Sequence, residues 1–226
     1  MGEQWNNDVL QYLTEKGPLQ LFSKMLEKNS SEPCLILGFS FEEEILGQFY
    51  KKIIGVNISQ HEFHDPNTNS RSHDLIVCDA EYLPFKNASI KNVISRAFLD
   101  HIDPHKGLLE IKRIVTDDGF LYMWEPGKFN LVAAIGRKFF PTRVHAKTEK
   151  PFNPIFLKNL VEQDFGSIEY QGYYHIISSI LPILAKYFKF FQNKKVLNFT
   201  DKFDQLLAKT FFKNFAWVII FGASKK

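Results

Sequence analysis

Hydrophobic residues gather in short runs through the first part of the chain, and polar or amphipathic segments separate these runs. A short run in which nearly every position is apolar is typical of a strand that is buried on both faces, as in a parallel sheet. The strands expected from this pattern are residues 32–39, 53–59, 74–80, a run that begins at residue 90, and 120–126.

The segments between these runs show helical periodicity. Residues 7–28 predict one or two amphipathic helices, interrupted by a Gly-Pro pair. Residues 40–52 predict a helix with Ser40 as its N-cap and carboxylates in its first turn, and residues 105–119 predict a helix that ends at a glycine turn. Strands that alternate with helices indicate an α/β fold with a doubly wound, Rossmann-like sheet, which binds ligands at the carboxyl ends of its strands.

The pattern changes after residue 126, where the chain becomes basic and is interrupted by prolines. The elements expected there are a helix near residues 153–164, a strand over 167–177, two amphipathic helices within 177–213 joined around 193–200, and a strong final strand within 214–225.

A chain of 226 residues, 45% of them hydrophobic, suits one α/β domain with a cap or two small domains. Cys34 and Cys78 lie in apolar runs without the C-x-x-C spacing of a metal site, so we expect two reduced, buried thiols and no metal. The first residues lack the apolar segment of a signal peptide, and no apolar run reaches the roughly 18 residues of a membrane span. These features predict a cytoplasmic protein.

The net charge of +3 conceals a difference between the two parts of the chain. Residues 1–126 carry 12 Lys and Arg against 19 Asp and Glu, a net charge of −7, whereas residues 127–226 carry 16 against 6, a net charge of +10. A basic second half indicates either an anionic partner, such as a phospholipid surface, nucleic acid or an acidic metabolite, or simply a solvated lysine-rich face.

Residues 78–126 contain several spaced motifs in a defined order. The motifs are Asp79-Ala80 after a strand, Leu83-Pro84-Phe85, His101-Ile102, a Leu-x-Glu-x-x-Arg pattern from Leu108 to Arg113, Asp118-Gly119, and the strand Phe120–Glu125. This order resembles the class I S-adenosylmethionine-dependent methyltransferases, in the broad group related to the ubiquinone and menaquinone methyltransferases. The resemblance extends over roughly residues 33–126 and 214–225.

The resemblance implies one domain whose sheet has about seven strands, mostly parallel, with an antiparallel last strand. The expected parts are N-terminal helices over residues 1–30, a cofactor-binding core over 31–126, a substrate-side insert and cap over 127–213, and the closing strand over 214–226.

The resemblance also implies S-adenosylmethionine as cofactor and a set of residues that contact it. Asp79 would accept a hydrogen bond from the adenine amine and Ala80 would meet a ring nitrogen, although without the resemblance Asp79 could equally cap a turn. Asn57 and Ile58 would lie at the ribose, and Gly38 and Ser40 in the turn after the first strand. The segment that holds Ser95 and Arg96 would pass the methionine part, with Arg96 pairing with a carboxylate or lying at the surface.

Some positions depart from the family pattern. Ile36 stands where the family usually has an acidic residue, and Ser40 and Glu42 replace glycines. Asn57 replaces the acid that binds the ribose hydroxyls. A neutral hydrogen bond in place of a charged one weakens binding by about 1 kcal/mol. Glu42 either compensates for the missing acid on the cofactor's amine side or faces water. We therefore expect weak binding or an altered pose.

The acceptor is expected to be a small apolar molecule, such as a lipid or a lipid-linked sugar. Residues 180–195 mix aromatic, aliphatic and lysine side chains, which suits a membrane surface, the wall of an apolar pocket or an ordinary cover helix. Tyr173, Tyr174 and His175 are candidates for the acceptor pocket, with core packing expected for at least one of them. His101 is the candidate general base, with a structural role as its alternative. Nucleic acid is not favoured, because no base-methylation motif follows the fourth strand.

The sequence therefore predicts a cytoplasmic small-molecule methyltransferase, and membrane-surface contact through its basic half is one of the interpretations that its charge leaves open. The rival interpretation is a methyltransferase-like scaffold or partner subunit that has lost cofactor binding, supported by the departures at Ile36, Ser40, Glu42 and Asn57. A nicotinamide-dependent oxidoreductase is not favoured, because the G-x-G-x-x-G motif is missing.

Overall fold

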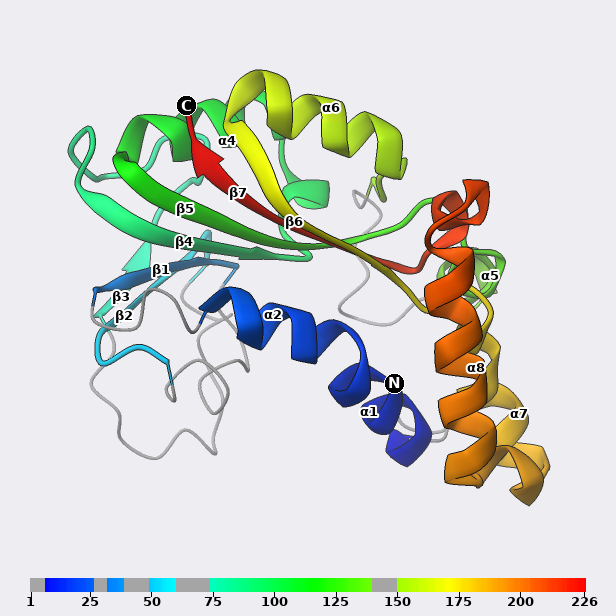
Figure 1. Ribbon diagram of the computed structural model, residues 1–226. Coiled ribbons are helices and arrows are strands. Elements are labelled where there is room, and N and C mark those ends of the chain that lie inside the picture. The colour runs from blue at the N-terminus through cyan, green and yellow to red at the C-terminus, as the bar shows by residue number, and fades with distance from the viewer. Residues whose placement is uncertain (1–6, 27–31, 39–48, 60–73, 140–149) are drawn as a thin grey trace.

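The computed structural model describes residues 7–26, 32–38, 49–59, 74–139 and 150–226 (Figure 1). Its centre is a seven-stranded sheet in the order β3-β2-β1-β4-β5-β7-β6. The strands are β1 (Cys34–Leu37), β2 (Ile53–Asn57), β3 (Asp74–Val77), β4 (Ile90–Arg96), β5 (Val115–Pro126), β6 (Gly166–Tyr174) and β7 (Val218–Lys225).

Strand direction follows the prediction. The pairs β1–β2, β2–β3, β1–β4 and β4–β5 are parallel, whereas β7 runs antiparallel to both β5 and β6. The Rossmann-like α/β fold with an antiparallel last strand is therefore confirmed. The parallel strand β1 is wholly apolar and wholly buried, as expected for a strand covered on both faces, whereas β4 carries the polar residues Lys91, Asn92, Ser95 and Arg96 although most of its positions are buried.

Helices cover the sheet on both faces (Figure 1). One face packs on α4 and α6 through Leu108, Ile111 and Leu157, and the other packs on α2 through Phe22 and Met25. The helix α1 lies against α7 and α8, which stand beside the sheet. The helices are α1 (Asn7–Lys16), α2 (Pro18–Leu26), α4 (Pro104–Ile114), α5 (Leu131–Phe139), α6 (Pro154–Asp164), α7 (Leu181–Tyr187) and α8 (Lys194–Leu207).

Two helix boundaries differ from the prediction. The helix expected over 105–119 ends at Ile114, and residues 115–119 belong to β5, because Val115 pairs with Ile90 across a register shift in the β4–β5 ladder. The junction expected around 193–200 is instead the first half of α8, since the Asn193 side chain accepts a hydrogen bond from Lys195 N and caps that helix.

Helix α5 was not predicted. The basic, proline-containing composition of residues 127–165 concealed its short apolar stretch. The helix expected over 40–52, with Ser40 and Glu42, falls mostly outside the described residues. Among the described residues, no helix is long and apolar enough to cross a membrane.

A buried polar cluster joins the sheet to α8. The carboxylate of Asp204 on α8 accepts hydrogen bonds from the backbone N–H groups of Ile176, Ile177 and Ser178, and from the Ser178 hydroxyl at 2.5 Å. Asn130 binds the same segment, because its amide donates to the carbonyl of His175 at 3.0 Å. These bonds fix the turn that follows β6.

Candidate cofactor site

Four strand ends meet at one edge of the sheet. Leu37 lies opposite both Val56 and Ser95, and Asn57 lies opposite Val77. The segments that follow these strands therefore lie side by side, as expected for a doubly wound sheet. The strand ends and the segments that follow them carry the residues predicted to bind the cofactor, namely Gly38, Asn57, Ile58, Asp79, Ala80, Ser95 and Arg96.

The turn after β1 requires glycine at position 38. Gly38 has a φ of +69°, a conformation that residues with a Cβ rarely adopt. A Cβ at this position would also lie 2.7 Å from the Phe98 ring. The backbone N–H of Gly38 donates to the Val56 carbonyl at 3.0 Å, so the turn begins at a fixed place. Phe98, which sequence reasoning missed, closes one side of this turn.

Replacement of Gly38 with alanine is expected to weaken S-adenosylmethionine binding by about tenfold or more. The left-handed backbone costs an L-residue roughly 1–2 kcal/mol, and the methyl group must also displace Phe98. Calorimetric titration of the variant measures this change. The control is Ala88→Gly, which relieves a positive φ in the loop before β4. Unchanged affinity in Gly38→Ala would remove the turn from the binding site.

Asn57 stands at the end of β2 with its side chain held in place. Its Oδ1 accepts a hydrogen bond from the Ile58 backbone N–H at 2.8 Å. Ile58 itself is exposed. The amide of Asn57 thus has a defined orientation at the sheet edge, between the turn at Gly38 and the segment after β3.

Asp79 caps the turn that follows β3, which is one of the two roles predicted for it. Its Oδ1 accepts from the backbone N–H of Glu81 at 2.9 Å, while its backbone carbonyl accepts from Tyr82. The side chain is exposed at the sheet edge, and Ala80 is buried beside it. The hydrogen bond to Oδ1 therefore orients the Asp79 carboxylate at this edge while the side chain stays exposed.

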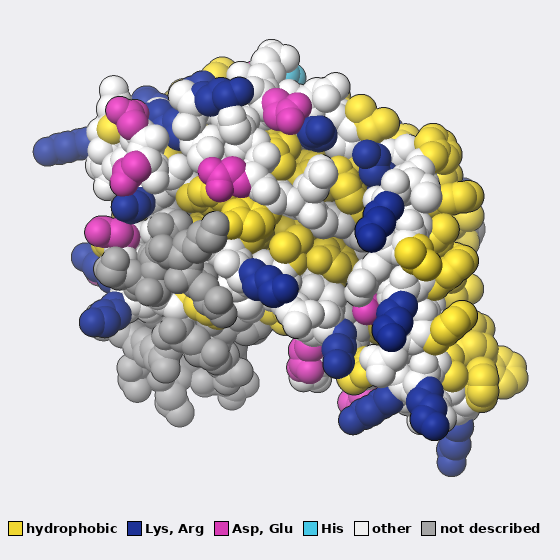
Figure 2. All heavy atoms as spheres, in the orientation of Figure 1, with side chains coloured by type: hydrophobic (Ala, Val, Ile, Leu, Met, Phe, Trp, Pro, Cys, Tyr) yellow, Lys and Arg dark blue, Asp and Glu magenta, His cyan; other side chains and the backbone are white. Residues whose placement is uncertain are grey.

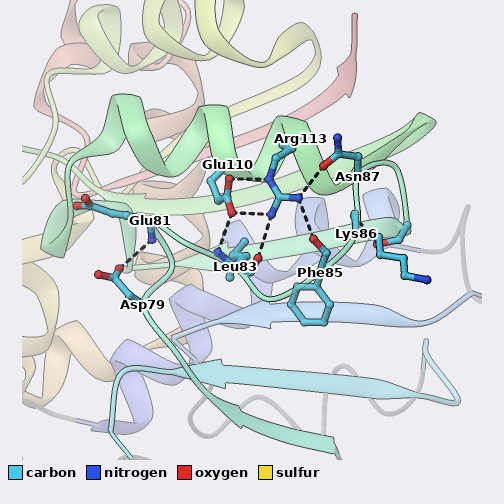
Figure 3. Close-up of polar contacts among 9 residues, drawn as sticks. Asp79, Glu81, Leu83, Phe85, Lys86, Asn87, Glu110 and Arg113 are labelled. Carbon is cyan, nitrogen blue, oxygen red and sulfur yellow. Dashed lines mark hydrogen bonds and ion pairs between the residues drawn. The ribbon is translucent and has the colours of Figure 1, made fainter.

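The segment from Leu83 to Asn87 is held by a network around Arg113 on α4 (Figure 3). The Arg113 guanidinium donates to the carbonyls of Leu83 and Phe85 at 2.9 and 2.8 Å, and to the Asn87 side chain at 2.8 Å. Two further bonds reach Glu110, whose carboxylate accepts from the Leu83 N–H. These bonds explain the Leu-x-Glu-x-x-Arg pattern, because its two charged residues bind the loop that carries Asp79 and Ala80.

A second contact holds the start of the same loop. The Glu81 carboxylate accepts from the Asp103 backbone N–H at 3.0 Å and pairs with Lys106 at 3.3 Å. Asp103 caps α4 through bonds to the N–H groups of His105 and Lys106. The loop is thus joined to both ends of α4, which keeps Asp79 at a fixed position.

Ser95 does not point into the open edge. Its hydroxyl donates to Glu125 Oε1 at 2.8 Å, and both residues are buried. The Glu125 carboxylate also accepts from the backbone N–H groups of Phe98 and Leu99. Burial, helped by the nearby Asp100 charge, raises the pKa of Glu125 to about 8, against the opposing effect of these hydrogen bonds. Glu125, an acid directly after the apolar run Phe120–Trp124, is a residue that the sequence pattern could have revealed.

The protonation of Glu125 predicts a pH-dependent stability. The folded protein keeps the proton that the unfolded chain, with a pKa near 4.5, has lost, so stability falls as the pH rises from about 4.5 to about 8. Glu125→Gln does not ionise and removes this decline. Urea unfolding of both proteins at several pH values measures it. Every other titrating group is common to both proteins, so parallel stability profiles would contradict the raised pKa.

Arg96 is the last residue of β4, and His101 follows it in the chain. The Arg96 guanidinium lies over the Trp124 indole, 4.7 Å from the ring centroid, which holds it on the α2 side of the sheet. His101 is in a 3-10 turn (η3, Leu99–His101), partly exposed, with Nε2 3.8 Å from Asp100 Oδ1. His101 is therefore accessible near the carboxyl edge of the sheet. Ser95 and Arg96 point to opposite faces of the sheet.

The three residues predicted to line an acceptor pocket are separated. Tyr173 packs on Phe221 in the core beneath α4 and α6, whereas Tyr174 belongs to the core on the α2 face. Adjacent strand residues point to opposite faces, and the core packing expected for at least one of these residues is found for Tyr173 and Tyr174. His175 is buried, and burial lowers its pKa to about 4, so it is neutral at physiological pH.

Residues 37–123, which include all four strand ends, match the family model described as a methyltransferase domain. The chain carries a class I S-adenosylmethionine-dependent methyltransferase domain. The matched segment contains the Gly38 turn, Asn57, Asp79 and the Glu110–Arg113 pair. S-adenosylmethionine is the cofactor of such a methyltransferase domain. No curated protein sequence matches the chain significantly.

Several solved structures share the fold of this methyltransferase. A chain in the Haloferax volcanii complex between the Trm112 methyltransferase activator and its methyltransferase partner is 14% identical, with a TM-score of 0.63 over 96% of this chain and 93% of that one. The geranyl diphosphate C-methyltransferase of Streptomyces coelicolor A3(2) is 12% identical, with a TM-score of 0.60 over 98% and 85%. A Methanosarcina mazei methyltransferase is 15% identical, with a TM-score of 0.56 over 87% and 93%. At these identities the similarity shows the fold.

Proposed function

We propose that this methyltransferase binds S-adenosylmethionine across the carboxyl edge of β1 to β4 and methylates a small apolar acceptor. The observation that carries the proposal is the meeting of the Gly38 turn, Asn57 and the capped Asp79 at one edge. These residues fit the cofactor, because a turn without a Cβ admits close backbone approach and the two polar side chains are already oriented.

Each residue has a proposed role. Asp79 accepts from the adenine amine, Ala80 meets a ring nitrogen through its N–H, and Asn57 with Ile58 borders the ribose. Arg96 is proposed to bind a carboxylate, either of the cofactor or of the acceptor. The Ser95 side chain acts indirectly, since its bond to Glu125 holds the backbone that passes the methionine part. Ser40 lies outside the described residues, and its contact with the cofactor stays a prediction.

S-adenosylmethionine, when bound, supplies a methyl group on a positively charged sulfonium. The protein's part is to align the acceptor and exclude water. His101 is proposed as general base for an acceptor that is not itself acidic, because it is partly exposed beside the edge. An acidic acceptor would need no base.

Titration with S-adenosylmethionine and S-adenosylhomocysteine tests the proposal. Asp79→Ala is expected to lower affinity roughly ten- to hundredfold, because one charge-assisted hydrogen bond is lost. Asp117→Ala, which removes an exposed carboxylate near the start of β5, is the control. Failure of the intact protein to bind either molecule would support the rival role, a non-catalytic scaffold or partner subunit.

The class of acceptor is proposed from the aromatic and lysine-rich residues after β6. The similarly folded Streptomyces protein acts on geranyl diphosphate, an apolar chain with an anionic head. Incubation with labelled S-adenosylmethionine and either a lipid extract or an aqueous metabolite extract distinguishes the classes. Label that enters the organic phase supports the proposal, and label found only in water-soluble products contradicts it.

A further inference from the structure

An apolar stripe runs along the outer face of α8. Phe199, Phe203 and Leu206 are spaced as neighbours on one side of a helix, and all three are exposed, Phe199 by 72%. The buried residues Leu197 and Asp204 occupy the opposite side, where α8 faces the rest of the protein. The stripe therefore points away from the core.

Further aromatic residues extend the apolar surface at both ends of α8. Phe188 and Phe190 precede the helix, and Phe211 and Phe212 follow it in the 3-10 turn η6 (Phe211–Phe215). All four are exposed. Figure 2 shows hydrophobic side chains along the right-hand edge of the molecule, where Figure 1 places α7 and α8. Contiguous apolar surface of this kind marks a binding face.

Lysines accompany this surface. Lys195 and Lys202 lie beside the stripe on α8, and Lys209 follows just after the helix. Residues 177–213 carry seven lysines against two acids, and one of those acids, Asp204, is turned inward. Figure 2 shows Lys and Arg side chains beside the hydrophobic edge. The outer face of α8 is thus both apolar and positively charged.

We infer that this face of α8 docks on the surface of an anionic phospholipid bilayer. Lysine is depleted in protein–protein interfaces, whereas membrane-surface helices combine lysine with Phe and Leu. The aromatic side chains enter the interface while the lysines bind phosphate headgroups. The inference goes beyond the proposed methyl transfer and does not depend on it.

Vesicle sedimentation tests the inference with the full chain. The protein is expected to sediment with phosphatidylcholine vesicles that contain phosphatidylglycerol, and far less with phosphatidylcholine alone. Phe199→Ser with Phe203→Ser should lower the apparent partition coefficient about tenfold, and Lys195→Glu with Lys202→Glu should do the same. Leu109→Ser, at an exposed position on α4, is the matched control and should bind as the wild type.

A second measurement reports insertion directly. Phe199→Trp is expected to shift its emission to the blue on anionic vesicles and to be quenched by brominated lipid. The inference is overturned if the protein does not sediment with anionic vesicles, or if the phenylalanine variant sediments as much as the wild type. A dimer in solution that the same phenylalanine changes dissociate would also overturn it, because the face would then bind a second copy. Cofactor titration of the same variants reports separately on the methyltransferase site.

Discussion

Asp204→Ala is expected to lower the free energy of unfolding by roughly 3–5 kcal/mol. The Asp204 carboxylate accepts three backbone N–H groups and one hydroxyl in a buried setting. Its removal leaves those donors without an acceptor, and each buried unsatisfied group is unfavourable by about 1–3 kcal/mol. The turn after β6 would loosen, and α8 would lose its hydrogen bonds to that turn.

Two further variants make this prediction specific. Asp204→Asn keeps an oxygen where Oδ2 binds Ile176 and Ser178, but loses the acceptor for Ile177, so it should destabilise less than alanine. Gln205→Ala, at an exposed neighbour whose side chain donates to Asp201, should have little effect. Urea unfolding measures all three. A similar loss in Gln205→Ala, or none in Asp204→Ala, would contradict the described role.

Arg113→Ala is expected to weaken cofactor binding by about tenfold although Arg113 lies outside the proposed binding edge. The guanidinium holds the carbonyls of Leu83 and Phe85. Without the guanidinium, the loop that carries Asp79 adopts several conformations, and the conformation that binds the cofactor is only partly populated. Stability should also fall by roughly 2–3 kcal/mol, because partly buried acceptors and Glu110 lose their donor.

The measurement is titration with S-adenosylhomocysteine together with urea unfolding. Arg113→Lys should recover little of the affinity, since one ammonium group cannot make the forked bonds to Leu83, Phe85 and Glu110 at once. Lys112→Ala, the adjacent residue, is the control. Full stability with unchanged affinity in Arg113→Ala would contradict the prediction, because the loop would then keep its conformation without the Arg113 hydrogen bonds.

The fold could largely be predicted from the sequence because its signals are local. The apolar runs at β1 and β2 are largely buried, and the alternation of strands with helices allows few topologies. Gly38 could be predicted for the same reason, since a glycine directly after a buried strand indicates a turn that excludes a Cβ. The spacing of Glu110 and Arg113 indicated the family, although the structural role of these two residues became evident only in the structure.

The remaining features depend on contacts between distant segments. The inward turn of Ser95 follows from Glu125, thirty residues away. The start of β5 at Val115 depends on its pairing with Ile90. Asp204 had a recognisable signal, because it lies seven residues after buried Leu197 and so shares its helix face, but its partners at 176–178 come from another element.

The central claim is that the adenosyl group lies across the carboxyl edge of β1 to β4. A crystal structure with S-adenosylhomocysteine tests it most directly. The account predicts the adenine amine within hydrogen-bond distance of the Asp79 carboxylate and a ribose hydroxyl at the Asn57 amide. Density for the ligand elsewhere, or an edge filled by the protein's own side chains at these two residues, would contradict the account.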